Sequence, residues 1–181
     1  MMNKKIRWIT ETAVLLALLV TLQALTKPMG QLVTGSCVNT VLAVAALLAG
    51  PASGITVALV SPVLAYLLGI APQILTVPAI MAGNTVYVLV LHFVGGNSSN
   101  WLWKIASWCV AAFAKFAVLY AAVVWLICGV LSEQLLSSGV LKAPMLKALP
   151  ATFSWPQLFT ALIGGGVALL IVPVLKKALH K

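Results

Sequence analysis

The chain has 181 residues, of which 62% are hydrophobic and only 7% are charged, and its formal net charge is +9. A soluble domain carries about a quarter charged residues, so this composition excludes a water-soluble globular protein and indicates lipid as the solvent for much of the surface. The positive charge does not indicate a nucleic-acid partner, because the basic residues gather at the two ends of the chain, where such residues set membrane orientation.

Six apolar segments are candidates for crossing a bilayer, which takes about 20 apolar residues in a helix. In chain order they are 8–25, 38–49, 53–70, 74–94, 101–131 and 155–175. Turn signals separate them: "TKPMG", Gly50-Pro51, Ala71-Pro72, "GGNSSN" and a polar stretch at 132–150. The second segment is short unless it includes part of the preceding "QLVTGS". The pattern predicts an all-α integral membrane bundle of six transmembrane helices in one domain, residues 1–181.

The distribution of basic residues predicts that both termini are cytoplasmic. With six spans, the cytoplasmic side holds more basic residues than the outer side, which is the expected bias. The inner set is Lys4, Lys5, Arg7, Lys104, Lys176, Lys177 and Lys181, and the outer set is Lys27, Lys142 and Lys147. A five-span count is the alternative, and it places the basic termini on opposite sides of the membrane.

One lysine lies in the middle of an apolar segment, "AAFAKFAVLY". Lys115 is about 21 Å along its helix from Trp101, and the only two acids of the chain, Glu11 and Glu133, lie at other depths. An ionisable residue inside a membrane indicates a functional site. Three interpretations remain: Lys115 lines a wet pocket and meets an anionic group of a ligand, it snorkels or bonds to helix carbonyls, or it is held neutral.

Asn84 is a second polar residue within an apolar segment. Its spacing from Tyr87 and Gln73 places all three near one helix face. Asn84 serves either to pack against another helix or to contact a ligand, and Tyr87 and Gln73 are candidates for the same pocket wall.

The 27–37 segment, "KPMGQLVTGSC", is predicted to be an outer loop. It carries Gln31 and Thr34, and Asn39 follows it, while two glycines allow it to bend. It is either an ordinary loop or a lid over a pocket that opens outward.

The segment "FSWPQLF" begins the last helix. Ser154 and Gln157 match a capping box, which explains Gln157 by itself, and Trp155 suits an interfacial anchor. Trp155 and Gln157 are also candidates for the pocket wall, as is Tyr120, one of few aromatic residues in the outer half.

The sequence carries no pattern that indicates catalysis. It has no HExxH motif, no P-loop and no pair of acids suited to acid–base chemistry, and the three cysteines show no metal-ligand spacing. His92 and His180 lie near helix ends. We expect neither an enzyme nor a bound metal or cofactor.

Small residues mark surfaces where helices approach closely. Ala13 and Ala17 form an AxxxA pair on one face of the first helix, and Gly164 to Gly166 give the last helix a small face.

The layout and four stretches together resemble a known family. The stretches are "WITETAVLLALLVTLQ", "VNTVLAVAALLAG", "SPVLAYLLG" and "FSWPQLFTALIGGGVALLIVPVLKKAL". They are similar to the substrate-binding S component of energy-coupling factor (ECF) vitamin transporters of the bacterial cell membrane.

The resemblance implies a mechanism. An S component binds a vitamin or related micronutrient near the outer face and docks on a separate T component that carries two cytoplasmic ATPases. In the family, the AxxxA residues contact the T component, which carries over to Ala13 and Ala17. The first outer loop gates the pocket, which carries over to Gln31 through Ser36. If Lys115 faces the pocket, charge complementarity favours a carboxylate vitamin such as pantothenate or nicotinate and disfavours a cation such as thiamine.

Two other classes of function remain as alternatives. The first is a small membrane scaffold or assembly subunit without a ligand of its own. The second is an independent secondary transporter or channel, for which inverted repeats are expected and are not visible in the sequence.

Overall fold

The computed structural model describes residues 4–70, 73–95 and 100–179, and every regular element in these ranges is a helix. The all-α prediction is confirmed for this part of the chain. The predicted turn at 71–72, residues 96–99 of the "GGNSSN" loop, His180 and Lys181 lie outside the described residues.

The first half of the chain forms three helices that follow one another closely. They are α1 (Lys4–Thr26), α2 (Gln31–Val44) continued by the π-helical η2 (Ala45–Ala49), and α3 (Pro51–Leu67), with the 3₁₀ turn η1 (Lys27–Met29) between α1 and α2. Glycines make both turns. Gly30 and Gly50 have φ of 88° and 92°, a conformation that residues with a Cβ rarely adopt, and Pro51 then opens α3 at a position where its missing N–H is not needed.

The predicted loop at 27–37 is wrong. Gln31 already begins α2, so only Lys27 to Gly30 connect the first two helices. The second helix therefore includes "QLVTGS" and extends over 19 residues, whereas α3 is the short one with 17 residues.

The second half contains the longest helices. The elements are η3 (Ile74–Thr76), α4 (Val77–Val90), η4 (Leu91–Gly95), α5 (Trp101–Leu119), η5 (Tyr120–Val130), α6 (Ser132–Ser137), α7 (Met145–Phe153) and α8 (Trp155–Ala178). Asn100 caps α5 by accepting from the backbone N–H of Leu102 at 2.9 Å. The polar stretch at 132–150, predicted as an outer loop, instead holds α6 and most of α7.

The predicted capping box at the start of α8 is also wrong. Ser154 occupies the N-cap position without a side-chain hydrogen bond. The Gln157 side chain does not return to Ser154 but donates to the Thr152 carbonyl oxygen at 3.2 Å. The break between α7 and α8 turns the chain at Ser154, so Gln157 is directed towards the end of α7.

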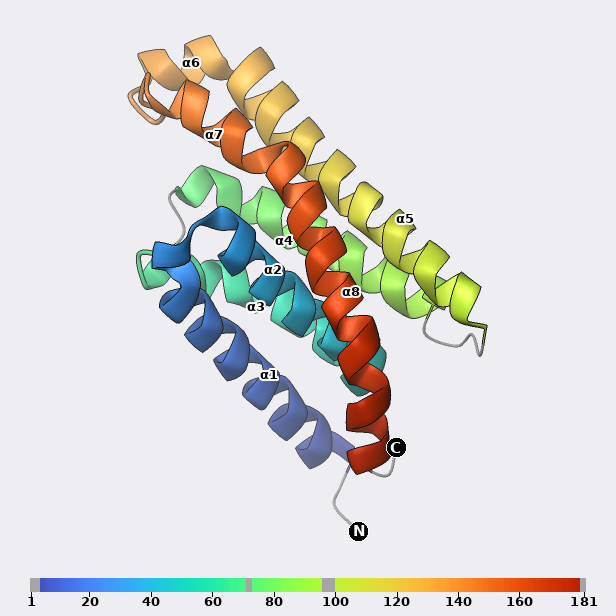
Figure 1. The fold of residues 1–181 in the computed structure, drawn as a ribbon. Coiled ribbons are helices and arrows are strands. Elements are labelled where there is room, and N and C mark those ends of the chain that lie inside the picture. The colour runs from blue at the N-terminus through green and yellow to red at the C-terminus, as the bar shows by residue number, and fades with distance from the viewer. Residues whose placement is uncertain (1–3, 71–72, 96–99, 180–181) are drawn as a thin grey trace.

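The start of α1 and the end of α8 lie at the same end of the bundle, and α6 and α7 lie at the opposite end (Figure 1). Helix α2 packs along α8, α4 packs against α3 and α5, and α1 packs against α2 and α3.

Five helical stretches of the described chain are long and apolar enough to span a membrane, and α3 is a shorter apolar helix. These helices support a multi-pass membrane protein. Six complete spans and cytoplasmic termini stay predictions.

Two apolar cores hold the bundle together. The main core includes Leu19, Leu42 and Val88 and lies among α1 to α5 and α8. A second core, which includes Val123 and Phe153, lies between α4, the second half of the long α5–η5 helix and α7.

Candidate functional site

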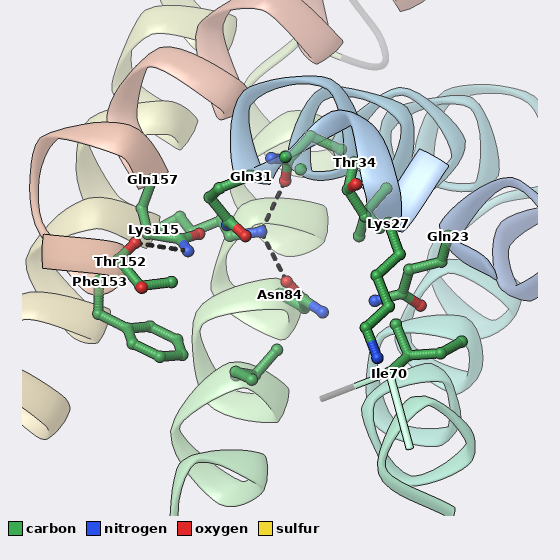
Figure 2. A pocket seen from close by; sticks show the side chains of 15 residues that line it. Gln23, Lys27, Gln31, Thr34, Ile70, Asn84, Lys115, Thr152, Phe153 and Gln157 are labelled. Atoms are coloured by element: carbon green, nitrogen blue, oxygen red, sulfur yellow. Dashed lines mark hydrogen bonds between the residues drawn. The ribbon is translucent and has the colours of Figure 1, made fainter. Parts of the chain in front are cut away.

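A cavity of about 160 Å³ lies where the two cores meet. Its wall includes Val38, which packs against the main core, and Phe153, which belongs to the second core. The lining residues come from α1, η1, α2, α4, α5, α7 and α8 (Figure 2). Because η1 follows the far end of α1, the cavity lies towards the end of the bundle opposite the termini.

Lys115 reaches this cavity from α5 and is only 3% exposed. Its Nζ donates to Oδ1 of Asn39 on α2 at 2.6 Å and to Oδ1 of Asn84 on α4 at 2.7 Å (Figure 2). The Tyr87 ring lies beneath the ammonium group, with its centroid 5.6 Å from Nζ, within reach of a cation–π contact. Lys115 therefore neither snorkels to an interface nor bonds to helix carbonyls; side-chain amides hold it inside the bundle.

A hydrogen-bonded chain continues from Lys115 into α8. Asn39 donates through Nδ2 to Oγ1 of Thr160 at 3.2 Å, and Thr160 donates to the Gln157 carbonyl oxygen at 3.1 Å. Asn39, Asn84 and Thr160 are all buried. These bonds tie α2, α4, α5 and α8 together around Lys115.

No acid of the chain balances a charge on Lys115. Of the only two acids, Glu11 pairs with Arg7 at 2.9 Å on α1, and Glu133 is exposed on α6. The amide oxygens on Lys115 are neutral dipoles, which stabilise an ammonium group but do not neutralise it. A charge in an apolar interior is stable only when it is paired, and neither acid of the chain lies beside Lys115.

Six of the predicted site residues line this cavity. They are Gln31, Thr34, Asn39, Asn84, Lys115 and Gln157. The convergence brings together residues that are up to 126 positions apart in the sequence (31 to 157). Their roles as substrate contacts stay predictions.

The other four predicted residues do not line the cavity, although the Tyr87 ring lies beneath Lys115. The Tyr87 hydroxyl donates to the Ala161 carbonyl oxygen at 3.1 Å. Nε2 of Gln73 donates to Sδ of Met145 at 2.6 Å. The rings of Tyr120 and Trp155 lie on either side of Phe116, with their centroids 5.7 and 5.6 Å from that of the Phe116 ring. Both residues are exposed on the side of the bundle. Neither they nor Gln73 and Tyr87 line the cavity, and a contact with substrate stays a prediction for each.

Sequence reasoning missed part of the wall, including Gln23 and Lys27. The Lys27 side chain bridges the first connection to the end of α3, because its Nζ donates to the Gly69 carbonyl oxygen at 2.5 Å. A signal for Gln23 was present, since it is the one amide side chain in the first apolar segment. The apolar wall residues Phe153 and Ile80 carried no such signal, because they resemble every other apolar residue of the bundle.

Ala13 and Ala17 lie on the outer surface of α1. Both are exposed, whereas Thr12, Leu15 and Leu19 form the buried face of the same helix. The small alanine face is thus open to a neighbouring helix.

Fold and site together define an all-helical, multi-pass membrane protein with a small cavity that a buried lysine lines. The family model for the ECF transporter, substrate-specific component, matches residues 7–176. The chain therefore belongs to this family, and the resemblance seen in the sequence is confirmed. Searches of the curated proteins and of the solved structures found no match. Members are transporter subunits, and membership implies a small-molecule substrate and association with a T component and ATPases.

Proposed function

We propose that this chain captures a small carboxylate-bearing substrate at the outer face of a bacterial cell membrane and delivers it inward with a T component and two ATPases. The observation that carries the proposal is Lys115, a lysine only 3% exposed on the wall of a cavity, with both acids of the chain lying elsewhere. With both termini in the cytoplasm, the cavity lies in the outer half of the membrane, where a substrate arrives.

The size of the cavity narrows the substrate class. Pockets for drug-sized ligands span about 300–1,000 Å³, whereas an apolar cavity of about 150 Å³ admits one benzene molecule. A volume of about 160 Å³ therefore suits a single ring or a short chain. Nicotinate, one ring with one carboxylate, fits this volume better than the longer pantothenate, and two lysines on the wall disfavour a cationic substrate.

The first connection is the part of the wall best suited to open. It is held to α3 by the bond from Lys27 to Gly69, and Gly30 supplies a flexible joint before α2. Because Gln31 through Ser36 are helical, entry of substrate involves a movement of Lys27 to Gly30 and the beginning of α2 rather than the folding of a long loop.

Substitution of the two cavity lysines tests the role of charge. Lys115→Met removes a charge-assisted interaction worth about 2 kcal/mol, so nicotinate affinity should fall roughly 30-fold. Lys27→Met removes a lysine at the edge of the same cavity that is already bonded to a helix end, and it should change affinity less than about threefold. Isothermal titration of the detergent-purified variants measures both, with thermal unfolding as a check of the fold. Unchanged nicotinate affinity in Lys115→Met refutes the assignment.

Native mass spectrometry of the purified protein tests the proposal without choosing a ligand. A retained small molecule with a carboxylate supports it, and a retained cation contradicts it. Failure to bind any member of a vitamin panel favours the scaffold alternative instead.

A further inference from the structure

The two amides that flank Lys115 can each face it in only one way. An ammonium group donates hydrogen bonds and accepts none. Accordingly, Asn39 and Asn84 turn their carbonyl oxygens towards Nζ, at 2.6 and 2.7 Å. The amide nitrogen of each must then point away from Lys115.

The two amide nitrogens meet different surroundings. Nδ2 of Asn39 donates to Thr160. Nδ2 of Asn84 has no acceptor in the described part of the chain and points into the space between Lys115 and Lys27 (Figure 2). Asn84 is only 1% exposed and lines the cavity, so its Nδ2 is a donor on the cavity wall. Such a donor is stabilised by an acceptor that enters the cavity.

We propose that Asn84 binds the substrate directly through Nδ2, which donates to an oxygen of the substrate's carboxylate, and that Lys115 acts on the substrate largely through this amide. The inference rests on the proposed function, which it deepens by naming the residue that binds the carboxylate or carboxamide of the substrate, its head group.

The hydrogen bond from Lys115 has two effects on Asn84. It holds the amide in the orientation that presents Nδ2 to the cavity, and it polarises the amide so that its N–H groups become stronger donors. A planar carbonyl oxygen satisfies Nδ2 whether it belongs to a carboxylate or to a neutral carboxamide. Only the carboxylate gains from the positive charge in addition. The site should therefore accept both head groups and prefer the acid.

Two matched variants distinguish the effect of the Asn84 donor from the effect of the Lys115 charge. Asn84→Asp and Asn39→Asp each place a carboxylate on Lys115 and cancel its charge, and each is close in size to the native residue. Only Asn84→Asp removes the donor from the cavity wall. Thr160 can turn its hydroxyl to donate to the carboxylate in Asn39→Asp, which keeps that side of the network bonded.

The probes are three pairs of acid and amide: nicotinate and nicotinamide, benzoate and benzamide, butyrate and butyramide. Titration into wild-type protein should show at least one pair that binds, with the acid tighter. In Asn39→Asp the acid should weaken towards the affinity of the amide, and the amide should lose clearly less affinity than it loses in Asn84→Asp. In Asn84→Asp both should weaken about tenfold or more, because each loses its donor. Thermal unfolding of both variants verifies that the bundle is intact.

The outcomes distinguish this inference from the proposed function. If the amide ligands bind Asn84→Asp and Asn39→Asp with the same affinity, Asn84 does not bind the head group. The proposed role of charge still stands in that case, provided that the wild-type protein binds acids more tightly than amides. If wild type binds acids no better than amides while Asn84→Asp loses both, the anionic substrate class is wrong and the donor role of Asn84 stands. Failure of all three pairs to bind wild type overturns both.

Discussion

One of the side chains that hold Lys115 is itself positioned by Thr160, a residue that does not line the cavity. Thr160 accepts from Asn39 and so keeps the Asn39 carbonyl oxygen turned to Nζ. Thr160 is fully buried on α8. At the scale of single residues, the site therefore depends on a positioning residue one bond further out.

Replacing Thr160 by valine should show this dependence. Thr160→Val keeps the shape of the side chain but leaves the Asn39 amide nitrogen without its acceptor, at a cost of about 1–2 kcal/mol. Nicotinate binding should weaken as well, because Asn39 then holds Lys115 less firmly. Thermal unfolding and titration in detergent measure the two effects.

Thr85→Val is the matched control. The Thr85 hydroxyl donates only to the Met81 carbonyl oxygen of its own helix at 2.7 Å, a bond that adds little to stability. The control should unfold within about 0.5 kcal/mol of wild type. Equal destabilisation by the two variants speaks against a positioning role for Thr160.

At the scale of elements, the approach of α2 to α8 sets the position of Asn39. A Cβ added to Gly164 on α8 would lie 2.5 Å from the Ser36 carbonyl oxygen and 2.8 Å from the Thr40 backbone nitrogen. Backbone atoms of α2 therefore occupy the space that any larger residue needs. Small residues at such crossings allow membrane helices to pack closely.

Gly164→Ala should push the two helices apart. Overpacking of this kind costs about 1–3 kcal/mol, and the shift of Asn39 should weaken nicotinate binding. Gly166→Ala, two residues on, is the control, because its Cβ would meet only the Trp108 side chain at 3.2 Å. Thermal unfolding of the two variants compares them. A Gly164→Ala protein as stable as Gly166→Ala contradicts a tight crossing.

At the scale of the whole molecule, the cavity and the exposed alanine pair of α1 lie on separate parts of the protein. The cavity lies towards the end of the bundle opposite the termini, and Ala13 and Ala17 lie on the exposed face of α1. Family membership implies a T component as partner, and the exposed alanine pair is the surface proposed to receive it.

Larger side chains at these two positions should impair assembly with the T component and leave substrate binding unchanged. Ala13→Leu with Ala17→Leu fills the notch between helices, so co-purification with co-expressed T component and ATPases should fall strongly. Nicotinate affinity and thermal unfolding of the isolated subunit should stay at wild-type values, because both positions are exposed. The control is the same double change at Ala106 and Ala117, two exposed alanines of α5, and it should leave co-purification unchanged. An effect of equal size in the control places the interface elsewhere.

Several features followed from the sequence alone. A chain with 62% hydrophobic and 7% charged residues cannot expose its surface to water, and apolar segments between glycine and proline turns located the long helices. Lys115 and Asn84 stood out because a polar residue in such a segment is costly. The family itself was visible in four stretches.

Tertiary structure alone decided which polar residues meet. Both the lipid and the interior of a membrane bundle are apolar, so the pattern of a helix does not reveal which face turns inward. Tyr120 and Trp155 therefore looked as suitable for the pocket as Gln31, yet packing leaves both exposed outside it. Likewise, nothing local shows that Asn39 and Asn84 converge on Lys115 from two other helices. The sequence determined that a buried charge exists, and only the packing of four helices determined what surrounds it.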